Sequence, residues 1–178
     1  SVPDKRLEEL ANLNKSLKVI PTFMDFIDIA GLVKGASQGE GLGNKFLSHI
    51  RQVDIVAHVI RCFEDDKITH VSKKINPIDD INTVETELLL ADLETLEKKK
   101  ESLIKKSKSG DKTTNNQLKF TSELIDNIAN NKSINSLNLS EEENIFLKSL
   151  NLISSKPLMY ICNVDEASII TGNVFSRK

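Results

Sequence analysis

The sequence has few of the residues that build metal centres and no segment of the kind that spans a membrane. Its two cysteines and three histidines are scattered, and none has a partner at the spacing of zinc ligands. No apolar run approaches the roughly 20 residues of a transmembrane helix, and the first residues have neither the basic flank nor the apolar centre of a signal peptide. We therefore expect no transition-metal site built by the protein, no membrane partner and a cytoplasmic location, with Cys62 and Cys162 as buried, reduced thiols.

The overall charge is also small. Lys and Arg number 24 and Asp and Glu number 26, which gives a net charge of -2. A protein with this balance has no general affinity for polyanions. The length of 178 residues and the apolar content of 39% suit one sizeable core, with room for an appended subdomain.

Two apolar runs end in polar residues at places where nucleotide-binding sheets carry their ligands. The first closes on Asp28, with Gly31 three residues later. An aspartate at the carboxyl end of a buried strand can hold magnesium through water, and the glycine lets a backbone N–H approach a terminal phosphate. The second run, residues 158–162, ends in the tetrad Asn-Val-Asp-Glu at 163–166. The two motifs together predict nucleotide chemistry; the alternative for each is an ordinary strand that ends in a turn.

Helix and strand periodicities alternate along the chain and indicate a parallel sheet. We expect an amphipathic helix at residues 4–15, an extended segment crossing the core at 19–30 and a second helix at 44–51. A strand covered on both faces should follow at 55–63, and a last strand should begin at 157. His58, inside the fourth of these, is expected to be a core histidine with its hydrogen bonds satisfied. Five of the seven glycines lie at positions 31, 35, 39, 41 and 43, so this loop can sit close to a ligand and is expected to act as a switch.

A helical insertion interrupts the sheet pattern. Apolar residues spaced by three and four predict a long helix after Pro77 and a second helix from Leu118, which most simply pack as an antiparallel hairpin around a polar tip at residues 107–116. Ser140 and Glu143 form the signature of a capping box that opens a further helix. We expect residues 1–79 and 151–178 to be parts of a nucleotide-binding domain of the G type, and residues 80–150 to be the helical hairpin insertion.

These motifs resemble those of the YchF family of P-loop NTPases, also called Obg-like ATPases, which are relatives of translation-associated GTPases. DIAGLVKGAS and GEGLGN (residues 28–37 and 39–44) look like the second switch of that family, RCFEDD (61–66) looks like its next strand end, and the tetrad at 163–166 also fits. The resemblance covers essentially the whole chain. It implies an α/β fold with a parallel sheet of the P-loop NTPase type, interrupted by a coiled-coil-like hairpin, and a ribosome-associated switch that binds and hydrolyses ATP with Mg²⁺.

The chain departs from the family pattern in one respect. Family members begin with a strand and a Walker A loop, yet no G-x-x-x-x-G-K-[ST] occurs here, and the family's C-terminal ubiquitin-like module is also absent. Without the loop that cradles the phosphates, triphosphate affinity should be very poor. We therefore expect this chain to be a fragment that is inactive alone, with hydrolysis a property of the full-length protein.

The resemblance assigns catalytic roles near the phosphates. Asp28 would orient a water on magnesium, and the Gly31 N–H would contact the terminal phosphate. Leu32 stands where Ras-like enzymes carry a glutamine, and its alkyl side chain cannot hydrogen-bond to the attacking water. The family is proposed to use a histidine in the loop after the next strand, which makes His70 the candidate for positioning that water. A loop histidine that is simply solvated is the alternative.

The tetrad would read the base. Guanine-specific sites end this tetrad in aspartate, and Glu166 is one methylene longer, which disturbs the bidentate contact to guanine. Asn163 can still accept from the adenine 6-amino group and donate to N7, while Val164 can only pack on the ring. We therefore favour ATP over GTP, with GTP as the weaker alternative ligand.

The insertion also carries a local excess of positive charge in the lysines Lys98, Lys99, Lys100, Lys105, Lys106, Lys108 and Lys112. Such a run is usually a solvated helix face, but it could also contact ribosomal RNA. Since only Phe120 lies near for base stacking, the contact should be electrostatic, and sequence-specific DNA binding is not expected. Two functional alternatives remain at this point: a guanine-specific GTPase of the Obg type, and a non-catalytic hairpin adaptor that binds the ribosome or RNA.

Overall fold

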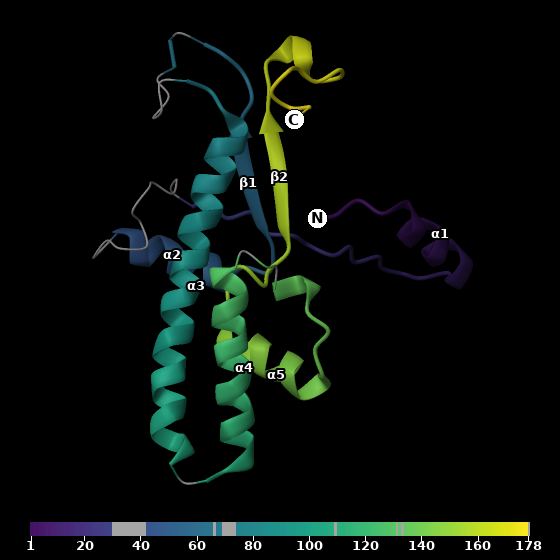
Figure 1. Cartoon of the computed structure of the whole chain (residues 1–178). Coiled ribbons are helices and arrows are strands. Elements are labelled where there is room, and N and C mark those ends of the chain that lie inside the picture. Colours follow the sequence, from purple (N-terminus) through teal and green to yellow (C-terminus); the bar gives the residue numbers. More distant parts are fainter. Residues whose placement is uncertain are drawn as a thin grey trace. The chain divides into compact units, whose positions relative to one another are not determined.

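The computed structural model describes residues 1–29, 42–65, 67–68, 74–108, 110–130, 132 and 134–177. The chain divides into two compact units, Ser1–Ala30 and Gly31–Lys178, and each is described here by itself (Figure 1). Within the described ranges, no helix is both long and apolar enough to cross a membrane.

The first unit contains helix α1, Lys5–Asn14, which confirms the predicted N-terminal helix. Asp4 caps it by accepting a hydrogen bond from the backbone N–H of Arg6 at 3.0 Å, and Lys15 ends it in the left-handed region, with φ of 51°. Neither cap needs support from outside the unit, because one is a side-chain hydrogen bond over two residues and the other is a local backbone conformation.

The predicted buried strand leading to Asp28 is wrong for this unit. Residues 16–29 form neither a helix nor a strand, Phe26 is 82% exposed, and Asp28 is exposed as well. A strand requires a neighbour to satisfy its backbone N–H and C=O groups. Among residues 1–29, a backbone hydrogen bond from Val2 N to Thr22 O at 2.8 Å joins the N-terminal end of the chain to the middle of this segment, and one such bond does not build a sheet.

The second unit contains a parallel pair of strands, as predicted. Strand β1, Val56–Arg61, pairs with β2, Leu158–Asn163, in a register that runs from Val56 opposite Leu158 to Arg61 opposite Asn163. Because almost 100 residues separate the two strands in sequence, the helices between them form the crossover that parallel pairing demands.

The predicted burial of both strand faces is wrong. Ile60 is the buried residue of β1, whereas Val59 is 61% exposed and all of β2 is exposed. Helix α3 contacts β1, but within the described part of the second unit no helix or strand covers the opposite face. The same cause corrects the expectation for the thiols: Cys62 is buried, and Cys162, in β2, is exposed.

Helices α3, Pro77–Ser107, and α4, Lys112–Ala129, form the predicted antiparallel hairpin (Figure 1). The tip is shorter than residues 107–116, because the Asp111 carboxylate accepts a hydrogen bond from Thr114 N at 2.9 Å and starts α4 at once. The capping box is confirmed: Ser140 N donates to Glu143 at 2.8 Å and opens α5, Glu141–Leu150.

The three helices, together with the short 3₁₀ helix η1 (Ile134–Ser136), enclose one apolar cluster. Its buried members come from α3, α4, η1, α5 and the segment after α5: Leu96, Leu103, Phe120, Leu124, Ile128, Ile134, Phe146, Leu147, Leu150 and Leu152. Burial of these side chains, each worth about 1.5–3 kcal/mol, is the main force that holds the hairpin together.

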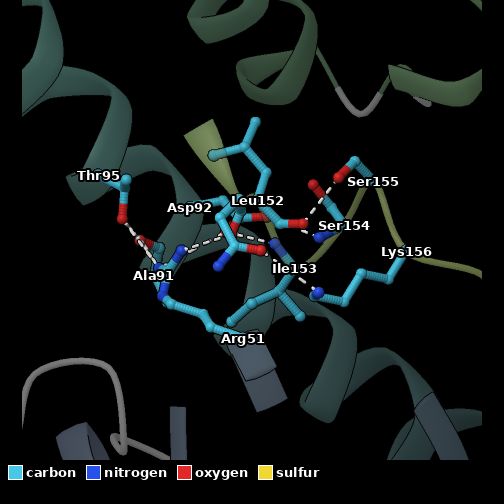
Figure 2. Close-up of polar contacts among 10 residues, drawn as sticks. Arg51, Ala91, Asp92, Thr95, Leu152, Ile153, Ser154, Ser155 and Lys156 are labelled. Atoms are coloured by element: carbon cyan, nitrogen blue, oxygen red, sulfur yellow. Dashed lines mark hydrogen bonds and ion pairs between the residues drawn. The ribbon is translucent and has the colours of Figure 1, made fainter. Parts of the chain in front are cut away.

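Helix α2, Leu42–Gln52, corresponds to the helix predicted at 44–51 and buries Leu47 and Ile50. Its last turn meets α3 and the segment before β2 in a set of polar contacts, which we call the Arg51–Asp92 junction (Figure 2). The junction consists of the contacts among Arg51, Ala91, Asp92, Thr95, Asn151, Ile153 and Ser154. Lys156 adds a bond from Nζ to Val53 O at 2.7 Å, so the end of α2 is tied to both neighbours.

Candidate nucleotide-binding site

The carboxyl ends of β1 and β2 lie side by side at one edge of the sheet (Figure 1). Arg61 is opposite Asn163 in the register, and the N–H of Cys62 donates to Asn163 O at 2.7 Å, one residue beyond β1. Ligands of open α/β sheets bind outside the carboxyl ends of the strands. The edge formed by these two ends is therefore the candidate site.

The tetrad follows directly from β2. Asn163 and Glu166 are exposed and Val164 is half-buried. Asp165 is used locally: its Oδ1 accepts a hydrogen bond from Ser168 N at 2.9 Å, which caps η2, Glu166–Ser168, and the hydrogen bonding from Ser168 holds the pKa of this carboxyl below its usual value. Asp165 is exposed as well, but its carboxylate is engaged in this cap, so the Asn163 amide and the Glu166 carboxylate are the tetrad groups that we expect to contact a base edge.

Asn173 supports this edge and was not identified from the sequence. Its Nδ2 donates to Cys62 O at 2.7 Å, and its Oδ1 accepts from the N–H groups of Phe175 and Ser176 at 3.0 Å. Gly172 precedes it with φ of +67°, a conformation that favours glycine. The Gly-Asn pair signals a turn, but nothing in the local sequence indicates that the asparagine would reach back to β1.

Arg61 organises the loop after β1 and was also missed. Its guanidinium donates to the backbone oxygens of Phe63, Asp65 and Ile68 at 3.1, 3.2 and 3.0 Å, and it lies 4.7 Å from the centre of the Phe63 ring. An arginine at the end of an otherwise apolar strand was the available signal. The planar fork of donors explains why one side chain can hold three carbonyl groups.

The structure does not describe where the remaining predicted site residues lie relative to this edge. Asp28 belongs to the other unit, and Gly31, Leu32 and His70 lie outside the described residues. Within the described ranges no group of three or more His, Cys, Asp or Glu side chains could hold a metal ion. An exposed Asp28 nevertheless suits magnesium, which proteins bind through one or two carboxylates together with waters and substrate phosphates.

Two further titratable groups near the sheet take no part in the site. Burial raises the pKa of the Cys62 thiol to about 11, so it stays protonated and is a poor nucleophile at neutral pH. The expectation of a satisfied His58 is wrong: the ring is half-buried, and its Nδ1 is buried with no hydrogen-bond partner among the described residues. Desolvation accordingly lowers the pKa of His58.

Comparisons with known proteins show what this chain is similar to. The family model described as 50S ribosome-binding GTPase matches residues 9–92. The Ribosome-binding ATPase YchF of Bacillus subtilis is 49% identical over 174 residues, covering 97% of this chain and 48% of the relative. The protein of the same name from Haemophilus influenzae is 49% identical, covering 93% of this chain and 46% of the relative.

A solved structure has the same fold. The Schizosaccharomyces pombe YchF GTPase superimposes with a TM-score of 0.81 at 34% identity, and the match covers 99% of this chain and 49% of that chain. This chain therefore spans about half the length of the relatives it matches.

Proposed function

Because this chain belongs to the YchF family, we propose that the full-length protein is a ribosome-associated switch that binds and hydrolyses ATP. The relatives are named as ribosome-binding ATPases and as GTPases. These names agree on hydrolysis of a nucleoside triphosphate, but they differ on whether its base is adenine or guanine. Ribosome association would place the protein in the cytoplasm. We retain residues 1–79 and 151–178 as parts of the nucleotide-binding domain, with residues 80–150 as its insertion.

The choice of ATP rests on one observation, which is the carboxylate of the tetrad that remains available to the base. The Asp165 carboxylate is engaged with Ser168, so the carboxylate left to meet the base is that of Glu166. Its extra methylene disturbs a bidentate contact to guanine, which needs an acceptor for both N1–H and the 2-amino group. Adenine has neither donor, and the Asn163 amide can pair with its 6-amino group and N7.

The roles near the phosphates follow the same proposal. The Asp28 carboxylate would accept hydrogen bonds from magnesium-bound water, the Gly31 N–H would donate to the terminal phosphate, and the His70 imidazole would orient the attacking water. When bound with ATP, Mg²⁺ would neutralise part of the negative charge of the phosphates. Leu32 contributes no hydrogen bond and so leaves water positioning to His70.

Calorimetric titration of ATP and GTP, each with magnesium, into the full-length protein should show tighter binding of ATP. Glu166→Asp should restore the shorter carboxylate and raise GTP affinity by about tenfold, the effect of about 1.4 kcal/mol. Glu141→Asp is the matched control, because the same change at the exposed start of α5 should leave both affinities unchanged.

Tighter GTP binding by the unaltered protein would instead support the guanine-specific GTPase. Binding of neither nucleotide would favour the hairpin adaptor.

The hairpin tip is the surface that we propose for the ribosome. Lys98 is paired with Glu94 at 2.5 Å, and Lys99 lies 5.3 Å from the centre of the Phe146 ring, so these two are engaged within the insertion. The lysines at the tip are exposed: Lys105, Lys106, Lys108 and Lys112. We call these four the tip lysines. Lysine side chains grouped in this way bind phosphate backbones without reading sequence.

Reversing the charge of three tip lysines, by Lys105→Glu, Lys106→Glu and Lys108→Glu together, should weaken ribosome association by about tenfold at an ionic strength of about 0.15 M. It should also flatten the dependence of affinity on salt, because fewer counterions are released. Ribosome pelleting over a salt series measures both effects, and hydrolysis without ribosomes should not change.

The control variant carries Lys119→Glu, Lys132→Glu and Lys148→Glu, three exposed lysines elsewhere in the insertion, with the same change in net charge. Equal loss of binding by both variants would show that the tip is not a specific contact surface. Lys105 and Lys106 would then serve only to offset the negative end of the α3 dipole in its last turn.

A further inference from the structure

Arg51 joins three segments that are far apart in sequence. It lies in the last turn of α2, and its Nη2 donates to Thr95 Oγ1 at 2.8 Å and to Ala91 O at 3.3 Å, both on α3 (Figure 2). Its Nη1 donates to Asn151 O at 3.0 Å, in the residue that ends α5. One guanidinium therefore holds α2 to the hairpin and to the C-terminal end of α5.

Asp92 continues these contacts toward the candidate site. Its side chain has 0% exposure and lies 3.7 Å from Arg51 Nη2. Its two carboxylate oxygens accept the backbone N–H groups of Ile153 at 2.9 Å and Ser154 at 2.7 Å (Figure 2). Ile153 and Ser154 lead into β2, whose end carries the base-reading tetrad.

The position of α2 gives these contacts a function. The helix begins at Leu42, within the last residues of the predicted second switch, which ends at residue 44, and the side chains of Leu47 and Ile50 in its later turns are buried. A displacement of α2 must therefore either break the bonds of Arg51 or move α3 with it. Since the Asp92 charge is buried and the Arg51 side chain is only 23% exposed, solvent screens their interaction weakly and breaking it is unfavourable.

We propose that Arg51 is the positioning residue that couples the nucleotide state of the second switch to the helical hairpin, and hence to the ribosome; this inference rests on the function proposed above. Nucleotide-dependent movement of α2 is passed to α3 through Thr95 and Ala91, while Asp92 keeps β2 fixed to the same helix. Arginine is required because lysine offers a single ammonium, which cannot reach acceptors on α3 and α5 at once.

The test measures the affinity of the full-length protein for purified ribosomes with a non-hydrolysable ATP analogue and without nucleotide. The ratio of the two dissociation constants measures the coupling. We expect a ratio of about 5 to 150, the range of typical allosteric effects. Arg51→Gln should bring this ratio close to one while ATP affinity and hydrolysis without ribosomes stay unchanged. Lys119→Gln is the matched control: it removes one positive charge from an exposed pair with Glu123 on α4 and should keep the ratio of the unaltered protein.

Two more variants separate coupling from folding. Arg51→Lys keeps the charge beside Asp92 but loses the fork, so it should still fold, with a melting temperature lower by a few degrees for the lost hydrogen bonds, and should lose most of the ratio. Thr95→Val removes one acceptor and should lower the ratio less than Arg51→Gln does. An unchanged ratio in folded Arg51→Lys and Arg51→Gln would overturn the inference and leave the proposed function intact. A ratio of one in the unaltered protein would overturn both.

Discussion

Asp92→Asn should lower the free energy of unfolding of the full-length protein by about 3 kcal/mol, the cost of removing one partner from a buried charged cluster. The carboxylate accepts two backbone N–H groups with its two oxygens and lies beside Arg51. Asparagine has nearly the same size but only one acceptor, so its amino group would face a backbone N–H and leave that donor unsatisfied. The loss is therefore electrostatic and does not come from a cavity.

Urea denaturation followed by circular dichroism measures this loss, and hydrogen exchange locates it. The amides of Ile153 and Ser154 should exchange much faster in Asp92→Asn, because these are the groups that lose their acceptors. Asp126→Asn, the same substitution at an exposed position on α4, should change neither quantity. Equal exchange rates at Ile153 and Ser154 in the two variants would show that Asp92 does not hold the segment before β2.

His70→Ala in the full-length protein should lower kcat for ATP hydrolysis by about 100-fold, at the lower end of the range for a residue that positions or activates a reacting water. The affinity for ATP should not change, since the imidazole is proposed to contact the attacking water and not the nucleotide. Single-turnover hydrolysis with saturating ATP isolates the chemical step from binding and release.

His49→Ala is the matched control, because His49 is an exposed histidine on α2 with no proposed role in hydrolysis. If His70→Ala and His49→Ala hydrolyse ATP at the same rate and bind it equally well, water is positioned by another group, and His70 returns to the solvated loop histidine that its residue type alone suggests. A loss of ATP affinity in His70→Ala would point to contact with the nucleotide instead.

The sequence by itself predicted the features whose signals are local. The capping box at Ser140 lies next to the backbone groups it satisfies, so four residues contain the whole interaction. The hairpin was predictable because a spacing of three and four residues places the apolar side chains on one helix face. The parallel pairing of β1 and β2 followed from the alternation of strand and helix, and the tetrad at the end of β2 from the motif it resembles.

Only the tertiary structure decided what depends on partners distant in sequence. Whether the segment before Asp28 becomes a strand depends on a neighbouring strand, and none forms within its unit. Cys62 and Cys162 end similar apolar runs, yet one is buried and the other exposed, because the sheet is covered unequally. Asn173 reaches β1 across 111 positions, and Asp92 reaches Ile153 across 61. Such contacts leave no periodicity in the sequence, since each side chain satisfies a backbone group that only folding brings within hydrogen-bonding distance.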